Sequence, residues 1–193
     1  PHRKKAAIGY AVDRLGAVAA REFTTLQKAY RAGVPVPAPA RRVDNMFTMR
    51  FLGGDYRAPL LKDATLSEPL EVAKQALAVV EKLLDACIVH GDLSEYNLLY
   101  WESRLFVIDF PQAIDFSSRV DRYLRVEEAK PVLLRDVTNL CNYFSELNVD
   151  LNVEIEYQRL ASRLECYLYS SKPDWWARPG SNRGSPPFSF IAL

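Results

Sequence analysis

Apolar residues recur every three to four positions in several stretches of the chain, as expected for helices that bury one face. Four such stretches cover residues 8–31, 69–84, 127–147 and 152–169. Ser67 precedes the second and Pro69 lies in its first turn, so we expect serine to cap the free backbone N–H groups of that helix. Ala32 and Gly33 end the first helix, and a proline-rich connector follows over residues 34–39.

Shorter segments rich in β-branched and aromatic residues predict two β-hairpins. In the first, strands at residues 41–43 and 46–52 flank a turn at Asp44 and Asn45. In the second, strands at residues 97–101 and 105–108 flank a three-residue turn. With four helices and two hairpins in 193 residues, we expect an α+β fold with a full hydrophobic core.

Composition excludes few functions but indicates the cellular compartment. Lysine plus arginine (25) nearly balances aspartate plus glutamate (24), so the net charge of +1 predicts no membrane surface or sequence-specific DNA as a partner. No apolar run approaches the ~20 residues that a membrane helix needs. Cys87, Cys141 and Cys166 each fall in a helical stretch, and we expect buried, reduced thiols in a cytoplasmic protein.

Three polar residues at the ends of apolar strands carry the candidate chemistry. Asp92 and Asn97 are five residues apart, and Asp109 follows the apolar run 105–108. The hairpin between them returns the chain to the same end, so we expect Asn97 and Asp109 to lie close together. This order and spacing is typical of a kinase catalytic loop and its metal-binding aspartate. The alternative is a solvated loop with capping residues, which fits less well because all three end apolar strands.

The chain resembles the RIO family of atypical serine/threonine protein kinases, and its Rio-one branch most of all. The likeness rests on H-G-D-L-S-E-Y-N at residues 90–97 and I-D-F-P-Q-A at residues 108–113. Further similar segments lie at residues 21–26, 32–37, 60–63 and 134–137, so the resemblance covers roughly residues 15–147. It implies a protein-kinase-like fold with ATP and Mg²⁺ as cofactors.

The resemblance also implies a role for each residue of the cluster. Asp92 would be the catalytic aspartate, and Asn97 and Asp109 would bind Mg²⁺. In RIO proteins the residue similar to Asp109 can also accept phosphate, so Asp109 is a second catalytic candidate and an ATPase cycle is implied beside kinase activity. RIO proteins are associated with maturation of the small ribosomal subunit, so pre-ribosomal particles are an implied partner, and the protein substrate is open.

Further residues would bind the nucleotide. Glu22 matches the helix glutamate that pairs with the ATP-binding lysine. The segment with Met49, Phe51 and Leu52 would be the hinge whose backbone meets adenine, and Leu99 would form the floor of the adenine pocket. The implied organisation is a partial small lobe at residues 1–58, a large lobe at 59–170 and a poorly ordered tail at 171–193.

One departure from the family keeps other functions open. No glycine-rich phosphate loop and no lysine within an apolar strand precede Glu22, so we expect a truncated small lobe and weak ATP binding by this chain alone. A catalytically impaired fragment or scaffold is therefore an alternative. A small-molecule phosphotransferase of the aminoglycoside or choline kinase type is another, although residues 94–96 and 111–112 favour the RIO family.

Overall fold

The computed structural model describes the backbone of residues 2–169 and the side chains of residues 15–168. Its helices are α1 (His2–Arg31), α2 (Pro69–Asp85), α3 (Arg122–Glu146) and α4 (Val153–Tyr169), with a short 3₁₀ turn η1 at Leu61–Asp63. The strands pair as three separate two-stranded antiparallel sheets: β1 (Pro39–Val43) with β2 (Met46–Met49), β3 (Ile88–Val89) with β6 (Ile114–Asp115), and β4 (Leu98–Trp101) with β5 (Arg104–Val107).

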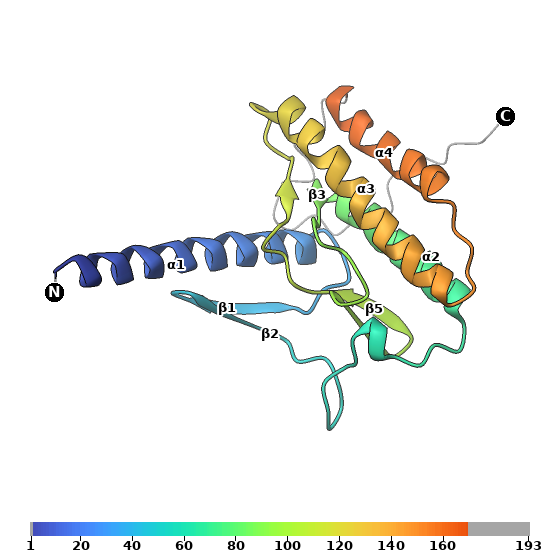
Figure 1. Cartoon of the computed structure of the whole chain (residues 1–193), viewed down its shortest axis with the longest axis horizontal. Coiled ribbons are helices and arrows are strands. Elements are labelled where there is room, and N and C mark those ends of the chain that lie inside the picture. The colour runs from blue at the N-terminus through green and yellow to red at the C-terminus, as the bar shows by residue number, and fades with distance from the viewer. Residues whose placement is uncertain (1, 170–193) are drawn as a thin grey trace.

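Helices α2, α3 and α4 lie together in the larger body of the molecule (Figure 1). Each of them buries one apolar face. Fully buried side chains from each of them meet in this core, among them Leu84, Leu140 and Leu160. Polar contacts close the outer side of the α2–α4 interface, where Arg159 and Arg163 both pair with Glu81. The large body is therefore held by a continuous core, with ion pairs only at its edge.

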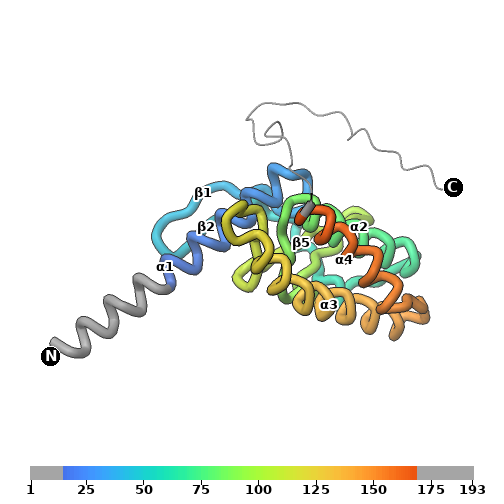
Figure 2. The backbone as a smooth tube through the Cα atoms, turned by 90° about the horizontal axis from the view of Figure 1, so that it is seen from above, coloured from blue at the N-terminus to red at the C-terminus, as the bar shows by residue number. Residues whose placement is uncertain are grey.

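Helix α1 and the β1–β2 hairpin lie on one side of this body (Figures 1 and 2). The last turns of α1 join the main core through Leu26 and Ala29. Phe23 packs on Phe47 of β2 with ring centroids 5.6 Å apart, which ties the helix to the hairpin. The hairpin itself is mostly exposed, so α1 is the element that connects it to the rest of the protein.

Two short pairings bring polar segments together. Strand β3 ends at Val89 and leads directly into the predicted catalytic loop, while its partner β6 lies just after the segment that begins at Asp109. Strands β4 and β5 turn through Glu102 and Ser103, both with positive φ (48° and 58°), which is typical of a two-residue hairpin turn. The two pairings thus hold both ends of the predicted site.

The four predicted helices are present, although α1 begins six residues earlier than expected, and α3 five. The two predicted hairpins are present too, but the second turns over two residues where we expected three, and β3 and β6 were not predicted. The prediction of a Ser67 cap is wrong: Glu68 occupies the cap position of α2 and its side chain makes no capping hydrogen bond.

The cysteine prediction holds in part. Cys87, Cys141 and Cys166 form no disulfide, and Cys87 and Cys141 are buried, but Cys166 is exposed. Cys87 lies after the end of α2, with a φ of 58°, so its placement in a helix is wrong. No helix in the described part of the chain is both long and apolar enough to cross a membrane. The tail predicted at residues 171–193 lies outside the described residues.

Candidate active site

The predicted catalytic loop begins with a buried histidine. The ring of His90 is 1% exposed, lies against the ring of Phe110, and its Nε2 lies 3.1 Å from the carbonyl oxygen of Ile108. That carbonyl can only accept, so Nε2 carries the proton, and Nδ1 accepts a hydrogen bond from the backbone N–H of Asp92 (3.3 Å). Burial lowers the pKa of His90 to about 4, against smaller opposing effects of Ile108 and Asp92. The neutral ring therefore links the loop to the strand before Asp109.

Gly91 makes the turn into the loop. Its φ is +88°, and a Cβ at this position would lie 2.5 Å from the backbone oxygen of Gln112. No side chain fits there without moving the neighbouring segment, so glycine lets the loop approach the chain that follows Asp109.

Helix α3 holds the loop from inside the protein. Both carboxylate oxygens of Asp136, which is 1% exposed, accept backbone N–H groups: Oδ2 from Gly91 at 2.8 Å and Oδ1 from Leu93 at 3.0 Å. Burial raises the pKa of Asp136 to about 6, although these two hydrogen bonds favour the charged form. Arg135 donates to the carbonyl of Gly91, and Asn139 Nδ2 donates to the carbonyl of Leu93 (3.2 Å). Three residues of one helix thus fix the main chain on both sides of Asp92.

The structure brings two predicted site residues into direct contact. Asn97 Nδ2 donates to the backbone oxygen of Asp92 at 2.7 Å and lies 3.3 Å from its carboxylate Oδ2. Because the amide nitrogen is engaged with Asp92, the amide oxygen of Asn97 is the atom available to a cation. Asp92 is partly exposed and Asn97 is nearly buried, so the pair lies at the boundary between core and solvent.

Asp109 follows at the end of the return strand. The backbone N–H of Ile108 donates to the carbonyl of Asn97 (3.0 Å), so the hairpin places residue 108, the neighbour of Asp109, beside residue 97. Asp109 itself is exposed and has a φ of +69°, a region that non-glycine residues seldom occupy. Backbone strain of this kind is concentrated at functional sites.

Helix α1 contributes a carboxylate beside Asp109. Burial raises the pKa of Glu22, the Asp109 carboxylate raises it further, and a hydrogen bond from the backbone N–H of Phe110 acts in the opposite direction. Glu22 forms no ion pair with a lysine or arginine among the side chains that the structure describes. Glu22 therefore lies beside Asp109, and no lysine pairs with it among those side chains, in line with the missing strand lysine noted in the sequence.

Two further contacts join α1 to the segment after Asp109. Arg21 Nη2 donates to the carbonyl of Pro111 (3.3 Å), and Lys28 Nζ pairs with Asp115 Oδ1 at 2.6 Å. Burial alone would raise the pKa of Asp115, but hydrogen bonds from Lys28 and Ser117 keep it below its ordinary value. The position of α1 and the course of residues 110–115 are thus coupled.

The residues present fit magnesium better than a softer metal. No group of three or more histidine, cysteine, aspartate and glutamate side chains that could hold a metal occurs within the described residues. Asn97 and Asp109 instead offer an amide oxygen and a carboxylate. Magnesium keeps several water ligands and takes one or two carboxylates from the protein, together with substrate phosphates.

The residues predicted for the hinge and for the adenine floor lie outside the catalytic loop. Met49 ends β2, and Phe51 (62% exposed) and Leu52 follow it. The chain after Leu52 runs beside β4, where Tyr100 donates its N–H to Pro59 (3.0 Å) and Leu60 pairs with Leu99. Leu99 therefore lies next to the segment that joins the β1–β2 hairpin to the helical body, and its role at the adenine remains a prediction.

Several residues of the site were not assigned a role from the sequence. Asp136 lies 45 positions from Gly91, and its carboxylate belongs to the motif at residues 134–137 that carried part of the resemblance. Arg135 adjoins it in the same motif. His90 was noted only as part of the loop pattern. Asn139 had no distinguishing pattern in the sequence.

The chain is similar to known proteins over most of its length. The family model described as "RIO domain" matches residues 10–158. The serine/threonine-protein kinase rio1 of Dictyostelium discoideum is 32% identical over 167 aligned positions, and the match covers 76% of this chain and 29% of that protein. The RIO-type serine/threonine-protein kinase Rio1 of Haloferax volcanii is 33% identical over 139 residues, 72% of this chain and 45% of that protein. The chain thus spans less than half the length of these two relatives.

Solved structures show the same fold. The Rio2 kinase of Chaetomium thermophilum matches with a TM-score of 0.63 at 19% identity, over 83% of this chain and 53% of that one. A second structure, of the ADP/Mg²⁺-phosphoaspartate complex of that kinase, matches with a TM-score of 0.57, also at 19% identity, over 83% and 51% of the two chains. The expected α+β, RIO-kinase-like fold is confirmed.

Proposed function

This chain belongs to the RIO family of protein kinases, and from that membership we propose that it transfers the γ-phosphoryl group of ATP with Mg²⁺. The observation that supports this best is the contact between Asn97 and Asp92, with residue 108 hydrogen-bonded beside them. Phosphoryl transfer relies on positioning and charge neutralisation, and these are the groups it needs.

Each residue of the cluster has a task in this proposal. Asp92 orients the acceptor hydroxyl and takes its proton. Asn97 and Asp109 would hold Mg²⁺, which supplies positive charge that neutralises the phosphate oxygens. His90, Gly91 and Asp136 keep the main chain around Asp92 in place, so the carboxylate needs little reorganisation when the substrate arrives.

The acceptor divides the proposal into two branches. As a kinase, the chain passes the phosphoryl group to a serine or threonine hydroxyl of a protein. As an ATPase, the Asp109 carboxylate attacks the γ-phosphorus, ADP leaves, and water then hydrolyses the acyl phosphate. The Rio2 kinase structure that contains a phosphoaspartate supports the second branch for a relative. We further propose a pre-ribosomal small-subunit particle as the partner and the cytoplasm as the location, on the family resemblance alone.

Docking without catalysis is the second candidate. It is favoured by Glu22, which has no lysine or arginine partner among the described side chains. Loss of the lysine contact to the phosphates would weaken ATP binding and turnover. In that case the folded large body would serve as a surface for other proteins.

Calorimetry of Mg²⁺·ATP binding to the 193-residue chain tests the nucleotide site. We expect magnesium-dependent binding that Asp109→Ala abolishes, because the variant loses a carboxylate ligand. Equal ATP affinity of the variant would refute the role of Asp109. No binding by the parent chain, with a circular dichroism spectrum showing that it is folded, would favour the docking candidate.

Transfer of radioactive phosphate from ATP tests the role of Asp92. We expect Asp92→Asn to keep nucleotide binding and to lose phosphate transfer by roughly two orders of magnitude or more, the scale for losing a positioned base. Autophosphorylation, a serine-containing peptide and small alcohols such as choline serve as separate acceptors. Transfer to choline alone would replace the protein-kinase branch by a small-molecule one.

A further inference from the structure

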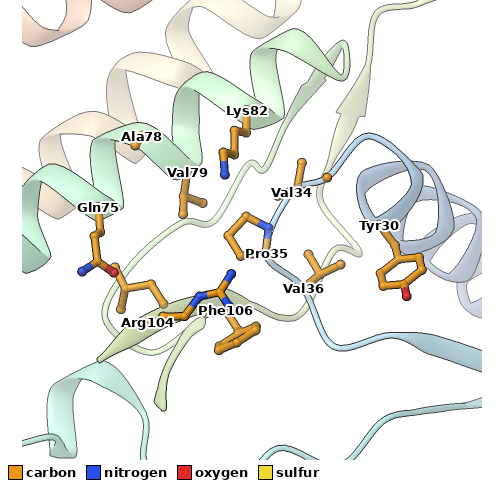
Figure 3. Close-up of a pocket in the computed structure, with 12 residues that line it drawn as sticks. Tyr30, Val34, Pro35, Val36, Gln75, Ala78, Val79, Lys82, Arg104 and Phe106 are labelled. Carbon is orange, nitrogen blue, oxygen red and sulfur yellow. The ribbon is translucent and has the colours of Figure 1, made fainter. Parts of the chain in front are cut away.

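A cavity of about 470 Å³ lies away from the catalytic cluster, where four parts of the chain meet (Figure 3). These are the end of α1, the connector at residues 33–36, helix α2 and the start of β5. None of its lining residues belongs to the predicted site. The volume is within the range of pockets that bind small ligands or a few side chains of a partner.

The inner walls of the cavity are apolar. Val34, Val36 and Val79 are each at most 5% exposed, and Pro35 and Phe106 lie beside them (Figure 3). Val34, Val36 and Val79 belong to the main core, which holds these walls in place. An apolar side chain of a ligand would therefore find a preformed surface here.

The rim carries positive charge. Lys82 and Arg104 line the cavity and are exposed, and no acidic residue of the described chain lines it. Neither cation pairs with a carboxylate among the side chains that the structure describes. Glu81 and Asp85, the acidic residues nearest to Lys82 along α2, are engaged by Arg159 and Arg163 of α4. The charge of the rim is thus uncompensated.

Arg104 is also held in place. Its guanidinium lies over the ring of Phe106, 5.7 Å from the centroid. A cation restrained on an aromatic face loses less side-chain entropy when it meets an anion.

We propose that this cavity is a docking site for an extended acidic peptide segment of a partner protein. Carboxylates of the segment pair with Lys82 and Arg104, and an apolar side chain enters the space beside Val79.

The terminal segments of the printed sequence do not match the charge of the rim. Residues 170–193 contain Lys172, Arg178 and Arg183 but only one acidic side chain, Asp174. Residues 2–5 are basic as well. Segments of this composition would be repelled by the cationic rim.

Fluorescence anisotropy with a labelled peptide, acetyl-Glu-Glu-Leu-Asp-Val-Glu-Glu-amide, tests the proposal on the whole chain. We expect saturable binding with a Kd on the order of 10–100 μM, and a loss of about tenfold or more for Lys82→Glu and for Arg104→Glu, since each variant places a like charge at the rim. Lys74→Glu is the matched control: it makes the same charge change on α2 outside the cavity and should leave the affinity within about twofold.

Three outcomes would overturn the proposal. One is no saturable binding up to about 1 mM peptide, in the range of the weakest specific complexes. Another is an equal loss in Lys74→Glu, which would show attraction to overall charge only. The third is equal binding of a peptide with serine in place of leucine, because the apolar side chain would then contribute nothing to binding. Amide shifts at Leu105 and Val34 in ¹⁵N spectra would support it. Mg²⁺·ATP binding is measured in the same samples, so failure of the docking site and of the nucleotide site are distinguished.

Discussion

The two segments that carry the candidate catalytic carboxylates are held in different ways. The loop at residues 90–97 is fixed by α3, where Asp136 and Asn139 bind its main chain inside the protein. The segment at residues 109–115 ends in β6, which pairs with β3, and its contacts with α1 are the exposed ones of Arg21 and Lys28. The two side chains of α3 that hold the first segment are buried or partly buried, whereas the two of α1 that hold the second are exposed or partly exposed.

The difference concerns competition with water. A buried carboxylate that accepts two N–H groups cannot exchange them for solvent, and losing it leaves both donors unpaired. Exposed ion pairs contribute little, because water and salt replace them readily. We infer that the loop with Asp92 is preformed, whereas the segment with Asp109 follows the position of α1.

The largest expected effect comes from removing the inner anchor. Asp136→Ala leaves the N–H groups of Gly91 and Leu93 buried without acceptors, at about 1–3 kcal/mol each. We expect the free energy of unfolding at pH 7 to fall by about 4 kcal/mol in urea titrations. Asn142→Ala, at an exposed position of the same helix, is the control and should change it by less than about 0.5 kcal/mol. A loss as small as the control's would show that the loop is not anchored by Asp136.

The inner anchor should also show in the pH dependence of stability. The pKa of Asp136 is about 6 in the folded protein against 3.8 in the unfolded chain. As the pH rises from about 4 to 6, the unfolded chain has already released this proton and the folded protein still holds it. The free energy of unfolding therefore falls with rising pH, by up to about 3 kcal/mol at 1.36 kcal/mol per pKa unit.

Titration of His90 changes the free energy of unfolding in the opposite direction over nearly the same pH range. Its pKa is about 4 when folded and 6.5 when unfolded, so stability is lost as the pH falls below 6.5. In the parent chain, the opposite effects of Asp136 and His90 on the pH dependence of stability largely cancel. Asp136→Asn isolates one of them: the stability difference between parent and variant should shrink from pH 4 to pH 6, measured by urea unfolding at each pH. A difference independent of pH would contradict the raised pKa of Asp136.

The smallest effect is expected at the outer anchor. A double-mutant cycle with Lys28→Met and Asp115→Asn should give a coupling energy of about 0.5 kcal/mol, because both side chains are partly exposed. The coupling should also decrease in 1 M salt, where the screening length is about 3 Å. A coupling above about 2 kcal/mol would mean that both segments are held equally firmly.

The sequence predicted those elements whose burial follows a regular period. Each of the four helices buries one face, and the apolar spacing located all of them. The strands β3 and β6 have two residues each, too few to show a period, and they were missed. The start of α3 was placed late because Tyr123 and Leu124 are exposed and do not follow the apolar face.

The order of residues predicted the contact between Asp92 and Asn97, but not the residues of α3 that hold the loop around Asp92. Asp92 and Asn97 lie five positions apart, and their contact is local. Asp136 looks like a surface residue within a helical pattern, and only its contact with a loop 43 to 45 positions away makes it a buried acceptor. Long-range contacts of this kind leave no periodic trace in a single sequence.

The main-chain character of the α3 anchor has a consequence for how this protein can change over evolution. Asp136, Arg135 and Asn139 bind only N–H and C=O groups of residues 91 and 93, which every amino acid except proline can offer. The side chain at position 92 can therefore be exchanged without loosening the loop. Loss of chemistry and loss of structure are separable here, so a lineage could give up phosphate transfer at Asp92 and still inherit a stable protein for other uses.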